Sequence, residues 1–293
     1  EWHFAPETSV LTSPMVMAAA LATATKRIRI GTAVHILPLH NPLHSAEEAA
    51  TIDHLTKGRF DFGIGRSGAV QNYIGYNVPY EESNQRFWEC LEIIKKAWTN
   101  DTFSYHGEYY AFENVNVIPK PLQNPFPPIR IAVSSPDSYP FSASKGLDLF
   151  VGLRGLPSTL KERIDIYRTK WAEAKHQRKP DVCLRVPLYI SEDMDAALSD
   201  PKESALNFYH NTLTKLFGAH IPIMSDQENA DRKGRAARVS NITYKEILDT
   251  DTAFGTPVSV TERILAFKET LGIDSIAAEI NFGGMLRPEQ VER

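Results

Sequence analysis

The sequence predicts an α/β protein, and more specifically a (β/α)8 barrel, on three observations. Short β-branched runs alternate with helical patterns along all 293 residues, which is typical of βα units and a parallel sheet. Three helices are predicted to begin at a capping residue followed by proline, at Ser13-Pro14, Asn41-Pro42 and Thr256-Pro257. About six strands and the tail of one more can be counted; one further strand and helix, together with completion of that tail, would bring the count to the eight strands of a barrel of about 250 residues, although a doubly wound sheet fits the same alternation.

The chain begins at Glu1 without an initiator methionine, and Glu1-Trp2-His3-Phe4 looks like the end of a strand. We therefore expect the chain to lack the first strand and helix of the barrel. We expect 1–293 to form a single domain, shortened at the C terminus as well. An excursion is expected near 105–128 and a lid-like insertion near 218–250, since long polar segments inside a compact domain are often functional.

The first elements have clear start and stop signals. An Ala- and Met-rich helix is predicted over 15–25 and a strand over 29–36, broken by Gly31. Asn41 offers a side-chain acceptor at the start of the next helix, which Lys57-Gly58 closes with a cation and a left-handed cap. A strand over 59–64 follows and ends in a glycine-rich loop.

The remaining elements follow in the same way. The patterns predict helices over 83–98, 158–176 and 195–217, and strands over 129–133, 149–153, 183–190 and 275–280. The segment 105–116 is predicted to be a small hairpin or an extended excursion, and the proline-rich segment 119–128 an extended connector. The polar segment 225–241 is predicted to be irregular.

Composition excludes several classes of protein. The net charge is −4 and the basic residues form no runs, so we expect neither nucleic acid nor an anionic membrane as a partner. No apolar segment approaches the roughly 20 residues of a membrane helix, and no signal peptide is visible. Cys90 and Cys183 are predicted to be buried small residues, which fits a reducing cytoplasm.

The loop Gly63-Ile64-Gly65-Arg66-Ser67-Gly68 matches G-x-G-x-x-G, but the dinucleotide fingerprint needs a helix that begins at the third glycine. The following segment, 69–80, looks like a loop, so we predict an anion site around Arg66 instead. Arg86 either adds a second guanidinium or pairs with a glutamate of its own helix. Ser134-Ser135, after the strand 129–133, suits a phosphate or an ordinary turn.

Other catalytic and metal motifs are not evident. The nine histidines do not have the spacing of a zinc site, because His35, His40 and His44 are separated by a strand end and a turn. No G-x-S-x-G is present, which argues against a serine hydrolase. We expect no metal.

Short motifs follow one another in a fixed order along the chain. They are Glu1-Trp2-His3-Phe4, Gly31-Thr32-Ala33-Val34, Leu37-Pro38, Asn41-Pro42, Ala46-Glu47, Asp53, Lys57-Gly58-Arg59-Phe60, Gly63-Ile64-Gly65-Arg66, Pro119-Lys120-Pro121, Pro128-Ile129, Ser134-Ser135, Lys145-Gly146-Leu147 and Phe254-Gly255-Thr256-Pro257. In this order they resemble the bacterial luciferase-like flavin-dependent monooxygenases over nearly the whole chain. The resemblance implies a TIM barrel of the luciferase-like type that uses reduced FMN and O₂.

The resemblance also implies a cofactor site. The family's phosphate pocket falls on Arg66, Gly68, Ala69, Arg86 and Ser135, with Ser134 where luciferase has a carboxylate. In the family the flavin ring rests on a bulge with a non-proline cis peptide, which falls on Ala33 and Val34 here. We predict a cis bond between these two residues.

Two departures from the family pattern concern the chemistry. The middle histidine of Glu-His-His-Phe serves proton transfer in luciferase, and Trp2 stands there in this chain, although tryptophan cannot act as a base. His3 is adjacent, but strand alternation directs it to the opposite face. Trp2 and His3 are thus the two candidate catalytic residues. Gly65 replaces a reactive cysteine of luciferase, so we do not expect light emission from an aldehyde.

The resemblance predicts an FMN-dependent monooxygenase, similar to alkanal monooxygenase, that oxygenates a small organic substrate. It implies O₂ as co-substrate, a separate flavin reductase as the source of reduced FMN, and a homo- or hetero-dimer in the cytoplasm. The segment 225–241 would be the lid that excludes water. Two alternatives stay open: a non-catalytic flavin-binding protein, and a deazaflavin (F420)-dependent oxidoreductase on the same barrel.

Overall fold

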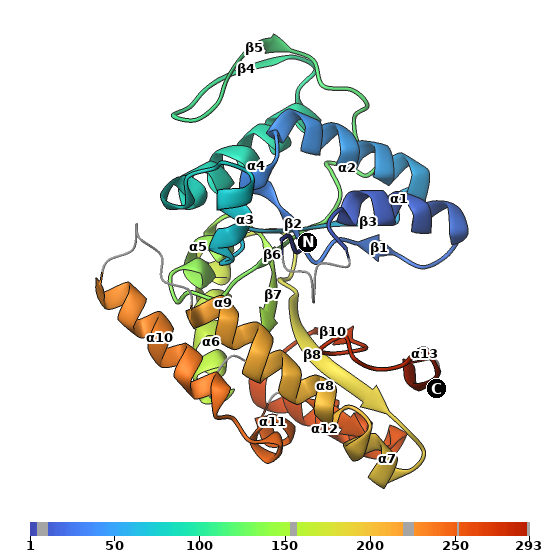
Figure 1. Ribbon diagram of the computed structural model, residues 1–293. Coiled ribbons are helices and arrows are strands. Elements are labelled where there is room, and N and C mark those ends of the chain that lie inside the picture. Colours follow the sequence, from blue (N-terminus) through green and yellow to red (C-terminus); the bar gives the residue numbers. More distant parts are fainter. Residues whose placement is uncertain (5–10, 153–156, 219–225, 251, 292–293) are drawn as a thin grey trace. The chain divides into compact units, whose positions relative to one another are not determined.

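The computed structural model describes residues 1–4, 11–152, 157–218, 226–250 and 252–291. The chain divides into two compact units, Glu1–Ala132 and Val133–Arg293. Each is an arrangement of parallel strands and helices (Figure 1). The predicted α/β class is therefore confirmed in both units.

In the first unit, the sheet is built around β3 (Phe60–Gly65), which pairs in parallel with β1 (Ile30–Gly31), β2 (His35–Ile36) and β6 (Ile129–Ala132). The register places Ile30 opposite Phe60, His35 opposite Ile64 and Phe62 opposite Ile129. The other elements are α1 (Pro14–Ala24), η1 (Leu37–Leu39), α2 (Pro42–Thr56), α3 (Val70–Gly75), η2 (Tyr80–Glu82), α4 (Ser83–Thr99), β4 (Phe103–His106) and β5 (Ala111–Val115).

Helix α2 forms as its sequence signals predict. The Asn41 side chain accepts a hydrogen bond from the Leu43 amide at 2.9 Å, and Pro42 occupies the first turn. Lys57 and Gly58 end the helix at positive φ angles of 56° and 78°. Buried alanines face the interior, and the Trp98 indole of α4 donates to the Ala46 carbonyl at 3.0 Å, so α2 and α4 pack closely.

The antiparallel hairpin β4–β5 projects beyond α4 (Figure 1), so the excursion that the sequence predicts near 105–116 is a hairpin. The connector after it is held by Asp53, a carboxylate with no exposed surface. Asp53 accepts hydrogen bonds from the Gln123 amide at 2.8 Å and from the Gln123 side chain at 2.7 Å. This contact fixes the connector that leads into β6.

In the second unit, β8 (Val182–Ile190) is the central strand, and it pairs in parallel with β7 (Asp148–Gly152), β9 (Ala253–Gly255) and β10 (Ser275–Glu279). Tyr209, Ile247 and Phe282 form a buried cluster between its helices. The helices are α5 (Ser138–Ser144), α6 (Pro157–Glu173), α7 (Met194–Ser199), α8 (Lys202–Asn207), the π-helix η3 (Phe208–Leu213), α9 (Thr214–Gly218), α10 (Asp226–Ser240), α11 (Tyr244–Thr250), α12 (Pro257–Leu271) and α13 (Pro288–Val291).

The structure corrects four expectations about the elements. Residues 1–4 are not in a strand, and the strand expected over 29–36 is two short strands separated by a bulge at 32–34. A short helix, α3, follows the glycine-rich loop where a loop was expected. The segment 225–241, predicted to be irregular, is helical over Asp226–Ser240, and residues 219–225 lie outside the described residues. The short strand β9 was not predicted.

Neither cysteine forms a disulfide and both are buried, as predicted. Burial raises the pKa of the Cys90 thiol to about 12, and its Sγ lies 3.4 Å from the Tyr110 hydroxyl. Such a thiol stays protonated at neutral pH and is not a nucleophile. Among the described residues, none of the helices combines the length and apolar character needed to span a bilayer.

Candidate functional site

The loop after β3 brings Arg66 to the start of α4. The Arg66 guanidinium donates to the Ser83 hydroxyl at 2.8 Å and lies over the Tyr80 ring, 5.4 Å from its centre. Tyr73 holds the loop by donating to the Arg66 carbonyl. A guanidinium beside the amino end of a 17-residue helix is a favourable place for an anion.

The backbone beyond Arg66 is accessible. A methyl group on Gly68 would meet no atom within 4 Å, so a ligand has room to approach this peptide. The Ser67 hydroxyl accepts from the Ala69 amide at 3.1 Å and fixes the turn. These features fit a bound phosphate, which needs a cation, an open backbone and a rigid loop.

Arg86 makes the alternative contact that the sequence left open. Its guanidinium donates to the Glu82 carboxylate at 2.7 Å, one turn earlier on the chain, and lies 4.6 Å from the centre of the Tyr109 ring. Burial opposes its charge, but the hydrogen bond to Glu82 and the other nearby groups leave the pKa of Arg86 raised. Pairing within the helix is therefore confirmed, and a role of Arg86 in phosphate binding stays a prediction.

The bulge between β1 and β2 has the peptide geometry that the resemblance predicts. The Ala33–Val34 bond is cis. The Thr32 hydroxyl donates to the Gly63 carbonyl at 2.7 Å and accepts from the Gly63 amide at 3.0 Å, so the bulge is tied to β3. A methyl group on Gly65 would lie 2.5 Å from Cγ2 of Val34. The Val34 side chain thus fills the space that a side chain at position 65 would occupy.

Trp2 and His3 lie in the same unit and differ in their contacts. The buried Trp2 indole nitrogen has no hydrogen-bond partner among the described residues. The His3 ring is engaged on both sides, by the Glu1 carboxylate at 2.8 Å and by the Tyr76 hydroxyl at 3.3 Å. Trp2 therefore has a free donor and His3 does not, although strand alternation is not the reason, because these residues form no strand.

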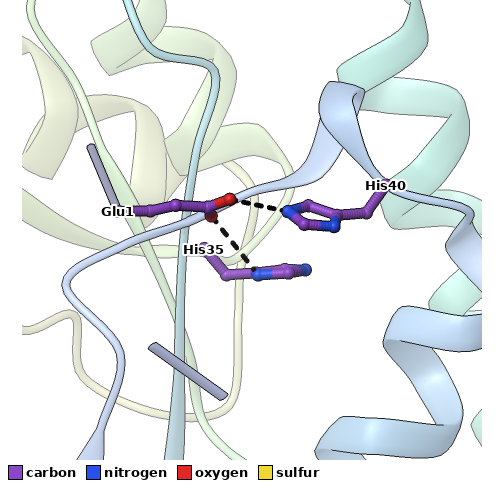
Figure 2. A group of neighbouring side chains, drawn as sticks. All are labelled: Glu1, His35 and His40. Carbon is purple, nitrogen blue, oxygen red and sulfur yellow. Dashed lines mark hydrogen bonds and ion pairs between the residues drawn. The ribbon is translucent and has the colours of Figure 1, made fainter. Parts of the chain in front are cut away.

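Glu1, His35 and His40 form a cluster that the sequence did not predict, because three separate segments contribute to it (Figure 2). Glu1 Oε1 lies 2.7 Å from His40 Nε2, and Glu1 Oε2 lies 3.5 Å from His35 Nδ1. The Glu1 and His35 side chains are almost completely buried, whereas 30% of the His40 side chain is exposed. The spacing of the histidines alone could not reveal the cluster, since its carboxylate comes from the N-terminal segment.

The charges of this cluster follow from burial and contacts. Burial alone would raise the pKa of Glu1, but His40, His35 and the Ile36 amide outweigh it and lower that pKa to about 2. Burial lowers the pKa of His35 to about 3, and the charge of His40 acts in the same direction. At neutral pH the cluster therefore holds an ionised carboxylate and a neutral His35 ring.

Ser134 and Ser135 belong to the second unit, where both are exposed. The Ser134 carbonyl accepts from Arg163 at 3.1 Å, and the Ser135 carbonyl accepts from the Ser138 hydroxyl at 2.6 Å. Their backbones thus take part in the turn that leads into α5. Their meeting with Arg66 at one phosphate stays a prediction.

Two further features were missed by the sequence. The Asn72 side chain is buried, and neither its oxygen nor its nitrogen has a partner among the described residues. Ser83, the partner of Arg66, was recognisable only as the start of a helix. A hollow of about 460 Å³ on the second unit contains none of the predicted site residues; its lining is Ser199, Lys202, Glu203, Leu206, Asn207, His210, Asn211 and Met285.

Comparison with known proteins decides the family. The model of the luciferase-like monooxygenases matches residues 1–275. The chain belongs to this family. The structure of the monooxygenase RslO1 from Streptomyces bottropensis covers 99% of the chain with a TM-score of 0.82 at 22% identity, and the chain covers 82% of RslO1. This likeness confirms the α/β fold of the luciferase-like barrel class.

Some of the relatives are named as flavin-dependent monooxygenases. The oxygenase component of flavin-dependent trigonelline monooxygenase from Acinetobacter baylyi is 27% identical over 96% of this chain and 78% of its own length. The FMNH₂-dependent dimethylsulfone monooxygenase of Pseudomonas putida is 28% identical over 88% of this chain and 70% of its own. An uncharacterized Sinorhizobium fredii protein, y4wF, is 33% identical over 58% of this chain, and the match spans about half (49%) of that relative.

Structures with a different cofactor share the fold. An F420-dependent secondary alcohol dehydrogenase, solved with an F420–acetone adduct, has a TM-score of 0.75 at 19% identity. The match covers 99% of this chain and 87% of the dehydrogenase. The fold alone therefore does not distinguish FMN from a deazaflavin.

Proposed function

We propose that the protein is an FMN-dependent monooxygenase that oxygenates a small organic substrate with reduced FMN and O₂. The observation that carries the proposal is the Arg66 guanidinium, held at the end of β3 by Ser83 and Tyr80 beside the accessible backbone of Gly68. Family membership and the names of the flavin-dependent relatives support it. The reduced flavin would supply the activation of O₂.

The residues of the first unit would bind and orient the flavin. Arg66 and the backbone of Gly68 and Ala69 would hold its phosphate, with Arg86 as a further phosphate ligand. A role of Ser134 and Ser135 at the same phosphate is what the family resemblance predicts. Arg86 would then share its guanidinium between Glu82 and the phosphate. The bulge at Ala33–Val34, tied to β3 by Thr32, would support the flavin ring.

Trp2 would take part by hydrogen bonding and not as a base. Its buried indole N–H lacks a partner among the described residues, and a bound flavin or substrate would supply an acceptor. The helical segment Asp226–Ser240 would belong to the lid that keeps water from the flavin. A separate flavin reductase would supply reduced FMN, as the name of the relative that is an oxygenase component suggests, and we expect a dimer.

Binding of the cofactor tests the Arg66 assignment. Oxidised FMN is titrated into the purified protein and its fluorescence followed, in wild type, Arg66→Ala and Arg27→Ala. Arg27 is an exposed residue between α1 and β1 and serves as the matched control. Loss of a charge-assisted hydrogen bond of about 1.5–3 kcal/mol predicts roughly 10- to 150-fold weaker binding for Arg66→Ala only. Equal affinity of Arg66→Ala and wild type would contradict the assignment.

Turnover separates the proposal from its alternatives. The protein is mixed with reduced FMN or reduced F420 under O₂ and with a panel of small organic substrates, and the products are analysed by mass spectrometry. Incorporation of ¹⁸O from ¹⁸O₂ supports a monooxygenase. Hydride transfer with F420 and no oxygen incorporation would identify a deazaflavin-dependent oxidoreductase. The F420-dependent alcohol dehydrogenase of the same fold is the reason to test this alternative. Bound flavin without turnover would favour a non-catalytic flavoprotein.

A further inference from the structure

We propose that Glu1, His35 and His40 form a binding site for a divalent first-row transition cation, with Zn²⁺ as the representative ion. The three residues each offer one ligand atom, and these atoms lie within 4.8 Å of one another. Two imidazole nitrogens and one carboxylate oxygen, with a position left for water, are a donor set typical of zinc. None of the three residues is among those that we propose to hold the flavin, so this proposal does not depend on the proposed function.

His35 gives an independent reason to expect a ligand. Its side chain is 1% exposed, and its Nδ1 has no hydrogen-bond partner among the described residues. This nitrogen faces Glu1 Oε2 at 3.5 Å, while Nε2 on the other side of the ring contacts the Ser45 hydroxyl at 3.0 Å. When Nε2–H donates to Ser45, two lone pairs face each other across this distance, and a cation between them removes the repulsion.

The surroundings of the donors are those of a metal site. Besides His40, the Glu1 carboxylate accepts from the Ile36 amide at 2.6 Å and contacts His3 Nε2 at 2.8 Å, so its orientation is fixed. The Ser45 contact fixes the His35 ring in the same way. Outer hydrogen bonds of this kind orient metal ligands and raise their affinity. An ionised carboxylate and a neutral imidazole are also the forms that bind metals.

His40 is the donor that would move. In a tetrahedral Zn²⁺ site, neighbouring ligand atoms lie about 3.3 Å apart, which is close to the 3.5 Å between Glu1 and His35. His40 Nε2 now contacts Glu1 Oε1 at 2.7 Å, and its ring stacks on His35 with centres 4.2 Å apart. Because His40 follows the short helix η1 and 30% of its side chain is exposed, a small rotation of its ring would open the space for the ion.

The test measures zinc binding to the purified, chelator-treated protein by competition with a chromophoric chelator. The variants are His40→Gln, Ser45→Ala and the control His44→Gln. His44 is 70% exposed at its side chain and lies four residues from His40, so the control removes an imidazole of the same region. Circular dichroism and thermal unfolding establish that each variant is folded.

We expect one Zn²⁺ per wild-type chain, at least 100-fold weaker binding for His40→Gln, about 10-fold weaker binding for Ser45→Ala, and no change for His44→Gln. Co²⁺ substitution gives a second measurement, since visible absorption bands of a four-coordinate Co²⁺ should be present in wild type and lost in His40→Gln. Absence of a stoichiometric site in wild type would overturn the proposal. So would equal zinc affinity of His40→Gln and wild type, or an equal loss in His44→Gln.

Discussion

The close contact between Gly65 and Val34 makes Gly65→Ala a severe change for a single methyl group. The new Cβ would lie 2.5 Å from Cγ2 of Val34, about 1 Å closer than an ordinary carbon–carbon contact. The Val34 side chain is β-branched, which restricts its χ1 angle, so it cannot easily turn away. Overpacking of this kind costs about 1–3 kcal/mol, and we expect the free energy of unfolding to fall by about 2 kcal/mol.

Urea denaturation followed by tryptophan fluorescence measures this change, with Gly68→Ala as the matched control. A methyl group at position 68 would meet no atom within 4 Å, so its effect should stay within about 0.5 kcal/mol. The double variant Val34→Ala/Gly65→Ala removes the clashing Cγ2. We therefore expect the two substitutions to be coupled by at least about 1 kcal/mol, with the double variant more stable than the sum of the single changes predicts.

The reasoning is refuted if Gly65→Ala is as stable as Gly68→Ala, or if the effects of Val34→Ala and Gly65→Ala simply add. Either result would mean that the Val34 side chain does not occupy the space beside Gly65. That space would then be available to a larger residue, such as the cysteine that the family resemblance places at this position in luciferase.

Two other predictions concern buried carboxylates and histidine. Asp53→Ala should lower the free energy of unfolding by about 2–3 kcal/mol, because the Gln123 amide and side chain both lose a buried acceptor; Asp53→Asn keeps one acceptor oxygen and should lose less in thermal unfolding. Equal melting temperatures of Asp53→Ala and wild type would contradict this. In the metal-free protein, the free energy of unfolding should decrease as the pH is lowered from about 6.5 to 3. In this range His35 binds a proton in the unfolded chain but not in the folded chain, where its pKa is about 3. Glu1, with its pKa lowered from 4.5 to about 2, adds a loss between those two values. His35→Gln should flatten the slope between pH 6 and pH 4.5, and an unchanged slope would show that His35 does not cause it.

Features set by neighbours in the sequence were predicted well. The cap at Asn41, the left-handed stop at Lys57 and Gly58, and the hairpin near 105–116 each depend on a few consecutive residues. The pairing of Arg86 with a glutamate one turn away was among the stated alternatives for the same reason. The cis bond between Ala33 and Val34 came from the family resemblance and not from any local propensity.

Features without an apolar pattern were predicted poorly. Helix α10 is polar along most of its length and contains Gly234, so no periodicity marked it. It is supported in part by polar contacts, such as the Gln227 side chain donating to Asp231 at 2.9 Å. Helix α3 has six residues, which is too short for a periodic signal.

The Glu1–His35–His40 cluster escaped prediction because three separate segments of the chain contribute to it. The cluster also matters for the proposed flavin site. The bulge at Ala33–Val34 lies between Thr32, which is bonded to Gly63, and His35, which is bonded to Ser45. A polar contact thus holds the chain on each side of the bulge, and the carboxylate of Glu1 fixes the Ile36 amide just beyond it. Since a support for a flat ring must not move, these buried contacts, and an ion that draws the cluster together, would stabilise the surface on which we propose that the flavin rests.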